Sequence, residues 1–215
     1  MAQRILVWDI PTRVFHWLQV LSFGAAYLTA FSERLRNYHV ALGYILLGLL
    51  VFRLLWGFVG TRYARFRSFL FSPGEIVSYL LSMLKGKAAH YLGHNPAGSV
   101  TVWLLLSLGM FISVTGVLAL QDDSGDVVVD LHGLATDVML GVIALHLLGV
   151  LTSSILHREN LVASMFTGLK QVSGQEPLAS AGPDEGIKDS YHWLGLLLVA
   201  AAIIFWFVYV KRPLG

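Results

Sequence analysis

Five long apolar stretches constrain the fold of this chain more than any other feature of its sequence. They cover residues 14–31, 39–59, 99–120, 131–155 and 192–210, and each is long enough to cross the hydrocarbon core of a bilayer as a helix. Only 13% of the residues are charged, whereas soluble domains typically carry about 25%. We therefore predict an all-α integral membrane bundle of five transmembrane helices, the last of them C-terminal.

The segments between these stretches divide the chain into three parts. Residues 1–170 form the predicted membrane domain, and residues 191–215 form the C-terminal transmembrane helix. Residues 171–190 are rich in Gly, Ser, Pro and acidic residues, a composition typical of a flexible linker, here on the cytoplasmic side. Residues 68–93 are moderately apolar but interrupted at Pro73, Gly74 and Glu75, which favours a helix lying on the inner membrane surface.

The N-terminus lacks the pattern of a cleavable signal peptide. Its charges are of both signs, and the first apolar stretch contains His16 and Gln19. We therefore expect this segment to stay in the protein as a membrane anchor. Cleavage after Ala30 is the alternative.

The basic residues favour one orientation in the membrane. A cytoplasmic N-terminus leaves few of the 15 Lys and Arg residues outside, namely Arg34, Arg36, Lys211 and Arg212. The outer loop after the third stretch then carries a negative patch with no basic residue, formed by Asp122, Asp123, Asp126 and Asp130.

The composition excludes several kinds of site. The chain has no cysteine, which excludes thiolate-bound iron–sulfur clusters, thiolate zinc sites and the C-x-x-C-H attachment of c-type haem. The formal net charge of +2 is too small to indicate a nucleic-acid partner. Any metal centre would therefore use His, Met or carboxylate ligands.

Four of the eight histidines, His16, His39, His132 and His146, lie within or at the ends of the predicted transmembrane helices. An ionisable side chain there is costly and usually has a functional partner. His132 and His146 are fourteen residues apart, so they lie within about 40° of the same helix face and about 21 Å apart along the axis. One helix thus presents two imidazoles at two depths.

The alternating direction of the helices decides which histidines meet. His39 would pair with His132 near the outer face, and His16 would pair with His146 near the inner face. A buried imidazole satisfied by a backbone carbonyl is the simpler interpretation of any one of them. Four histidines at matched depths favour two bis-histidine sites.

Two isolated imidazole pairs suit haem better than a small metal ion. Zinc usually takes four protein ligands, or three and a water. A porphyrin supplies four equatorial nitrogens, needs only axial ligands, and fills a bundle interior with its apolar bulk.

Two arginines are candidates for haem contacts. Arg53 follows His39 by fourteen residues, so it shares that helix face about 21 Å deeper and could pair with a propionate of the inner haem. Arg13 precedes His16 by three residues, on a neighbouring face. Anchoring at the inner interface explains both arginines equally well.

Other residues are less informative. His90, His94, His157 and His192 lie in loops or at helix ends, where interfacial roles are the more ordinary interpretation. Asp137 lies inside the fourth predicted helix and would either move protons or accept a hydrogen bond. Small residues in the first two predicted helices would allow either a porphyrin or a neighbouring helix to approach closely. They are Gly24, Ala25, Ala26, Gly43 and Gly48.

Four segments together resemble those of one known family. They are VFHW in the first helix, NYHVALGYILLGLLVFRLLWG in the second, LHGLATDVMLGVIALH in the fourth and HRENLVASMFTG just after it. With them, residues 5 to about 170 resemble the bacterial cytochrome b561 family, which includes the b-type cytochrome subunit of nickel–iron hydrogenases. The fifth helix departs from the simplest four-helix pattern of that family.

The resemblance implies a four-helix core in the bacterial inner membrane that holds two non-covalent b haems. Their axial ligands would be His16, His39, His132 and His146, and the haems would exchange electrons with a membrane quinone. On the inner side, Arg13, Arg53, His157 and Glu159 could serve a quinone site.

We therefore expect electrons to cross between an outer redox partner and the quinone pool. Complementary charge speeds encounter, so the outer acidic patch favours a basic c-type cytochrome or another periplasmic redox enzyme. The chain would be an electron-transfer subunit with possible quinone oxidoreductase activity. Three alternatives are superoxide oxidation coupled to quinone, a haem-free metal or proton transporter using the histidines and Asp137, and a passive membrane anchor for a larger enzyme.

Overall fold

The structure is a computed structural model, and it describes residues 2–121, 125–173 and 186–211. In these ranges the chain forms two short strands and seven α-helices. The strands are β1 (Ala2–Leu6) and β2 (Leu169–Ser173). The helices are α1 (Ile10–Thr29), α2 (Arg36–Val59), α3 (Pro73–Leu84), α4 (Pro96–Leu118), α5 (Asp126–Leu156), α6 (Leu161–Thr167) and α7 (His192–Val210).

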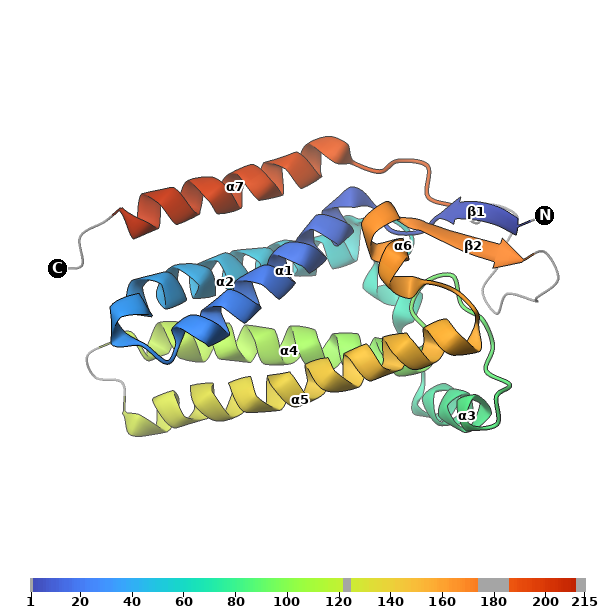
Figure 1. The fold of residues 1–215 in the computed structure, drawn as a ribbon, viewed down its shortest axis with the longest axis horizontal. Coiled ribbons are helices and arrows are strands. Elements are labelled where there is room, and N and C mark those ends of the chain that lie inside the picture. Colours follow the sequence, from blue (N-terminus) through green and yellow to red (C-terminus); the bar gives the residue numbers. More distant parts are fainter. Residues whose placement is uncertain (1, 122–124, 174–185, 212–215) are drawn as a thin grey trace.

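Five of the helices form an elongated bundle whose members alternate in direction. Helices α1, α4 and α7 run one way and α2 and α5 run the other, with α7 on the outside of α1 and α2 (Figure 1). The strands, α3 and α6 gather at one end, which we call the sheet end, while α1 and α4 end, and α2 and α5 begin, at the opposite end, the far end. Each of the five predicted apolar stretches is helical.

Within the described ranges, four segments are long and apolar enough to cross a membrane, which confirms the predicted membrane helical bundle. They are Glu33–Val59, Pro96–Leu118, Asp126–Leu156 and His192–Val210. The first predicted span is not among them, because α1 carries Arg13, His16 and Gln19 within an otherwise apolar sequence. With 20 residues, α1 still reaches about 30 Å, and it packs between α2 and α7.

Capping residues set the starts of three helices. The Asp9 carboxylate accepts a hydrogen bond from the Thr12 backbone N–H at the start of α1, and Asn95 caps α4 in the same way. Ser72 and Glu75 form a reciprocal capping box, the arrangement that satisfies two free N–H groups at a helix start. The residues that interrupt the apolar run at 73–75 therefore begin α3 rather than break a helix.

Helix α3 lies across the bundle axis at the sheet end (Figure 1). Tyr79 is its buried residue, while Val77, Leu81 and Leu84 are exposed. An exposed apolar face on a helix that lies across the bundle suits the predicted position at the membrane surface.

The antiparallel pairing of β1 with β2 was not predicted from the sequence. Leu6 pairs with Leu169 and Ala2 with Ser173, so residues 171–173 of the predicted linker belong to a strand. Beyond the linker residues 174–185, which lie outside the described residues, the Ile187 N–H donates to the Leu6 carbonyl and the Ser190 carbonyl accepts from the Ile10 N–H. The division of the chain into three parts stays a prediction.

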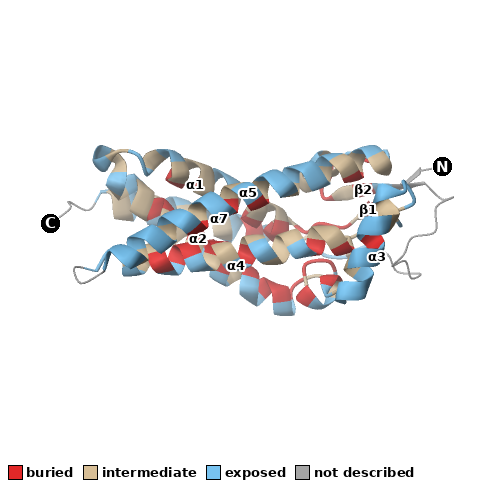
Figure 2. Ribbon diagram, turned by 90° about the horizontal axis from the view of Figure 1, so that it is seen from below, coloured by how far each residue is buried: buried red, intermediate tan, exposed pale blue. Residues whose placement is uncertain are grey.

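Buried residues line the inward faces of the helices (Figure 2). The largest cluster joins α1, α2 and α4 with the 3-10 turn after α2, and it contains Phe15, Leu49, Leu50, Phe66, Phe69 and Leu106. Large apolar side chains such as Leu28 and Phe58 are exposed on the outer faces, as lipid-facing helices require. Helix α7 approaches α1 closely at Gly195, where a Cβ atom would lie 2.4 Å from Cγ2 of Ile10.

Candidate functional site

His39 and His132 face each other at the far end of the bundle. His39 lies in the first turns of α2 and His132 in the first turns of α5, and their ring centroids are 6.1 Å apart with the ring planes at 77°. Metal–imidazole bonds are about 2 Å long, and each centroid lies about 1 Å behind its nitrogen, so two imidazoles that share one metal atom have centroids roughly 6 Å apart. The observed separation suits one metal atom between the rings.

Backbone carbonyls orient both imidazoles. Nδ1 of His39 lies 2.8 Å from the Ala26 carbonyl oxygen, and Nδ1 of His132 lies 3.0 Å from that of Ile112. A carbonyl oxygen only accepts, so each Nδ1 carries the proton and donates it. The Nε2 lone pairs are then left for a metal, and hydrogen bonds of this kind commonly orient metal-binding histidines.

A glycine that sequence reasoning missed allows this arrangement. A Cβ atom at Gly116 of α4 would lie 3.0 Å from Cε1 and 3.3 Å from Nδ1 of His132. The imidazole thus packs directly against the α4 backbone. A glycine facing a distant histidine leaves no signal in one sequence.

His16 and His146 lie at the sheet end. His16 is on the first half of α1 and His146 on the second half of α5, and the two side chains are close enough to interact electrostatically. Nδ1 of His16 is enclosed and has no hydrogen-bond partner among the described residues. Both pairs expected from the sequence are thus near neighbours, while their role as haem ligands stays a prediction.

Arg53 is buried between aromatic rings. It is 3% exposed, and its guanidinium carbon lies 5.2 Å from the ring centroid of Phe66 and 5.9 Å from that of Phe69. Its Nη1 has no hydrogen-bond partner in the described part of the chain. A buried arginine nitrogen without a partner suits a carboxylate such as a haem propionate.

Arg13 connects α1 to α6. Its Nη1 donates to the Phe166 carbonyl, and the neighbouring Trp17 donates through Nε1 to the Met165 carbonyl and stacks on Phe166. The Arg13 Nε is enclosed without a hydrogen-bond partner among the described residues. One role of Arg13 is therefore structural.

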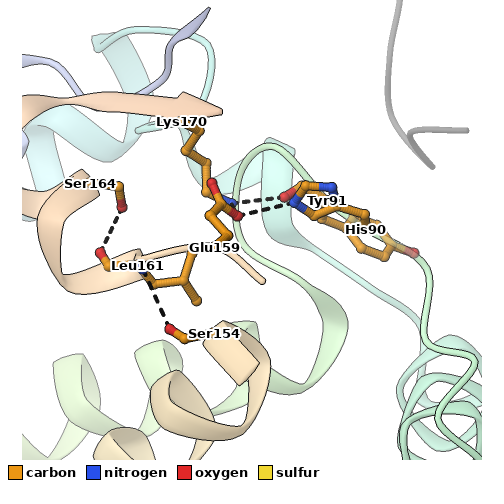
Figure 3. Close-up of polar contacts among 7 residues, drawn as sticks. All are labelled: His90, Tyr91, Ser154, Glu159, Leu161, Ser164 and Lys170. Atoms are coloured by element: carbon orange, nitrogen blue, oxygen red, sulfur yellow. Dashed lines mark hydrogen bonds and ion pairs between the residues drawn. The ribbon is translucent and has the colours of Figure 1, made fainter. Parts of the chain in front are cut away.

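Glu159 lies in a buried polar cluster at the sheet end (Figure 3). One carboxylate oxygen, Oε2, accepts from His90 Nε2 at 3.0 Å and from Lys170 Nζ at 3.2 Å, and Lys170 also donates to the Tyr91 carbonyl at 3.0 Å. His157 stacks on His90 with the ring centroids 4.8 Å apart. His90 and Lys170 were not predicted here, because a loop and β2 bring them to Glu159 from distant parts of the sequence.

Charge and burial act oppositely on this cluster. Burial alone would raise the pKa of Glu159, but the hydrogen bonds and positive charge from His90 and Lys170 hold that pKa below its ordinary value. Burial lowers the pKa of Lys170, and Glu159 opposes that shift. Glu159 therefore stays ionised at neutral pH.

A cavity of about 490 Å³, widely open to the outside, lies beside this cluster, between α5 and α6. Its lining combines apolar residues with polar ones from the α5–α6 connection and its flanks: the apolar ones are Leu147, Val150, Leu151, Ile155 and Val162, and the polar ones are Ser154, Arg158, Glu159 and Asn160. The second oxygen of Glu159, Oε1, is enclosed without a hydrogen-bond partner among the described residues. Val150 follows His146 by about one helical turn, so the cavity begins within about a turn of the sheet-end histidine on α5.

The residues present fit haem better than a bare metal ion. In the ranges that the structure describes, no group of three or more His, Asp or Glu side chains could hold a metal ion. Two-histidine pairs inside an apolar bundle match the axial ligation of a porphyrin iron. The enclosed Nη1 of Arg53 also matches a propionate.

This fold, with paired histidines inside a membrane helical bundle, defines the class as a membrane-embedded b-type cytochrome. The chain belongs to the prokaryotic cytochrome b561 family, whose family model matches residues 7–168. This match confirms the resemblance seen in the four sequence motifs. It implies haem b as the cofactor and electron transport as the activity class.

Curated relatives of the chain carry one kind of name. A probable Ni/Fe-hydrogenase B-type cytochrome subunit of Rhizobium leguminosarum bv. viciae is 24% identical over 81% of this chain and 92% of its own length. A protein of the same name from Azotobacter vinelandii is 25% identical over 80% and 91%. The probable Ni/Fe-hydrogenase 1 B-type cytochrome subunit of Escherichia coli K12 is 23% identical over 55% and 61%. No solved structure matches the chain significantly.

Proposed function

We propose that this protein is a di-haem cytochrome b that transfers electrons between a periplasmic redox partner at the far end and the membrane quinone pool at the sheet end. The observation that carries this proposal is the 6.1 Å separation of the His39 and His132 rings, each held through Nδ1 by a backbone carbonyl. His39 and His132 would hold one haem, and His16 and His146 would hold the other. Bound haem supplies a reversible one-electron carrier through its iron.

The protein's own residues fix the two sites. The carbonyls of Ala26 and Ile112 accept from Nδ1 of each far-end histidine, which leaves Nε2 unprotonated and able to bind a metal. The buried Arg53 offers positive charge to an anionic group at the sheet end. The apolar clusters around Phe15 and Leu46 exclude water from the bundle interior.

The cavity between α5 and α6 is the proposed quinone site. Its apolar residues suit the ring and tail of a quinone, and its polar residues suit the oxygens. The free oxygen of Glu159 would accept a proton from a quinol hydroxyl, and Arg158 and Asn160 offer donors in the same lining. His157 would contribute to the quinone site from its stacked position beside His90, because it does not line the cavity. The protein would then be a quinone oxidoreductase subunit.

The proposed orientation puts the sheet end in the cytoplasm. Arg62, Arg65, Arg67, Lys85 and Lys87 follow α2 or α3 at that end, in agreement with the bias of basic residues toward the inside of the bacterial inner membrane.

The far end would receive the redox partner. Asp126 and Asp130 are exposed at the start of α5, whereas Asp122 and Asp123 lie outside the described residues. An acidic surface favours a basic partner. The names of the relatives point to a hydrogenase-like enzyme, and a basic c-type cytochrome would suit the same charge.

A quinol-reduction assay tests the proposed site. A short-chain quinol should reduce the haem of purified protein, and Leu151→Trp, which fills the cavity from a helix face turned away from His146, should slow that reduction roughly tenfold or more while leaving the haem spectrum unchanged. Val138→Trp, at an exposed position of the same helix, is the matched control. Equal rates in the wild type and Leu151→Trp would contradict this site, and absence of quinol reduction would contradict quinone as substrate.

A further inference from the structure

Several enclosed nitrogens at the sheet end have no hydrogen-bond partner among the described residues, and three of them belong to neighbouring side chains. These three are Nη1 of Arg53, Nδ1 of His94 and Nε1 of Trp8. Arg53 lies in α2, His94 precedes α4, and Trp8 lies between β1 and α1. Three separate segments thus bring unsatisfied donors to one end of the bundle.

His94 and Arg53 lie beside one buried ring, that of Phe69, and Trp8 lies beside His94. The centroid of His94 is 4.6 Å from that of Phe69 and 4.9 Å from that of Trp8, and the guanidinium of Arg53 lies 5.9 Å from the Phe69 centroid. Phe69 is fully buried. His94 also lies within electrostatic range of Arg53 and His146, which places it beside the sheet-end histidine pair.

A group with only acceptors is missing from this arrangement. Buried N–H groups are nearly always hydrogen-bonded, and three donors with one fixed positive charge match a carboxylate best. The carboxylate of Asp9 lies within electrostatic range of Arg53, but it accepts from the Thr12 N–H, Trp56 Nε1 and Thr61 Oγ1 and leaves the three nitrogens without a hydrogen-bond partner among the described residues. Glu159 is similarly engaged with His90 and Lys170.

We propose that His94 and Arg53, with Trp8 beside them, bind a carboxylate group of the porphyrin held by His16 and His146. This inference rests on the proposed haem function and adds His94 to its binding residues. Burial, with the positive charge of Arg53, lowers the pKa of His94 to about 3. The imidazole is therefore neutral at pH 7 and can donate one hydrogen bond from Nδ1.

The substitution His94→Leu removes the donor, and His94→Gln retains one. Without a donor, the negative carboxylate is less compensated and favours the ferric iron, so the midpoint potential of the sheet-end haem should fall. The far-end haem should keep its potential in both variants. His192→Leu changes an exposed histidine at the start of α7 and should leave both potentials unchanged.

The test is a redox titration of the detergent-purified holoprotein, followed by redox-difference infrared spectra with carboxyl-labelled haem. A lowered potential of one haem in His94→Leu, restored in His94→Gln, supports the inference. Unchanged potentials in His94→Leu overturn it. If His94→Leu loses the haem, the infrared bands of the labelled haem carboxylate are compared between the wild type and His94→Gln. A shift of these bands supports the contact, and identical bands overturn it. Wild-type protein without haem would instead refute the proposed function itself.

Discussion

The imidazole of His132 packs against the backbone of α4, at the point where residue 116 is glycine. A methyl group there would lie 3.0 Å from the ring, so Gly116→Ala requires the ring or the helix to shift by a few tenths of an ångström, which disturbs the contact with the Ile112 carbonyl that orients the ring. Loss of such an orienting contact typically weakens metal binding about 10- to 100-fold. We therefore predict at least roughly tenfold weaker retention of one haem in Gly116→Ala, measured as the haem-to-protein ratio during dilution.

A second glycine provides the control for this variant. Gly149 of α5 has open space around the position of an added Cβ atom, so Gly149→Ala should retain both haems. Equal retention in Gly116→Ala and Gly149→Ala would show that His132 does not depend on its contact with α4.

Glu159 makes the sheet end sensitive to acid. Its pKa is below the ordinary carboxyl value of 4.5 in the folded protein, so its stabilising effect is fully present above that value and is lost as the pH falls through the lowered pKa. At pH 7, Glu159→Gln leaves the buried Lys170 unpaired, which should reduce the free energy of unfolding by about 3 kcal/mol. As the pH is lowered from 7 to 3, the midpoint temperature of thermal unfolding should fall less steeply in Glu159→Gln than in the wild type.

If the midpoint temperatures of the wild type and Glu159→Gln fall equally over that pH range, the role given to Glu159 is contradicted. The substitution Glu75→Gln is a useful comparison. Glu75 is an exposed carboxylate in the α3 capping box, so its replacement affects the start of α3 and leaves Lys170 paired.

Residues differ in how far their roles could be predicted from the sequence. The fourteen-residue spacing in α5 predicted that His132 and His146 lie at two depths, because helix geometry alone fixes that relation. Gly116, His90, His94 and Lys170 were missed or left as ordinary loop residues. Their partners are distant in sequence, and only the packing of loops and strands at the bundle ends brings them together.

At the scale of elements, Asp9 connects three parts of the fold. Its carboxylate caps α1 through the Thr12 N–H, accepts from Trp56 near the end of α2 at 3.0 Å, and accepts from Thr61 in the following loop at 2.6 Å. Hydrogen bonds to a charged group contribute about 1.5–3 kcal/mol each. Asp9→Asn should therefore lower the free energy of unfolding by about 2–3 kcal/mol, measured by denaturant titration in detergent.

The exposed Asp189 provides the control, since Asp189→Asn removes the same charge without buried partners. A loss of stability below about 0.5 kcal/mol in Asp9→Asn would mean that the carboxylate does not hold α1 and α2 together.

The long helices could be predicted from the sequence, but the small elements could not. Apolar runs of about twenty residues have few alternatives to a membrane helix. The strands β1 and β2 are five residues each and 162 residues apart between Leu6 and Leu169, so neither carries a signal without its partner. Pro73 appeared to interrupt a helix, but with Ser72 and Glu75 it forms a helix start.

At the scale of the whole molecule, basic residues are concentrated at the sheet end, while the start of α5 at the far end carries the exposed Asp126 and Asp130. Because the chain has no native cysteine, single cysteines report their location without background. Lys85→Cys follows α3 at the sheet end and Asp130→Cys lies at the far end, and both positions are exposed. With a membrane-impermeant thiol reagent on intact cells, we expect labelling of Asp130→Cys and protection of Lys85→Cys, and the reverse result would invert the proposed orientation.

The central claim is that two histidine pairs hold two haems in one chain. The most direct test is the haem content and the reduced-minus-oxidised spectrum of detergent-purified wild type, His39→Ala and His146→Ala. The account predicts two b haems per wild-type chain, loss of the far-end haem in His39→Ala and loss of the sheet-end haem in His146→Ala. A well-folded wild type with no haem, or haem content unchanged by both substitutions, would contradict it.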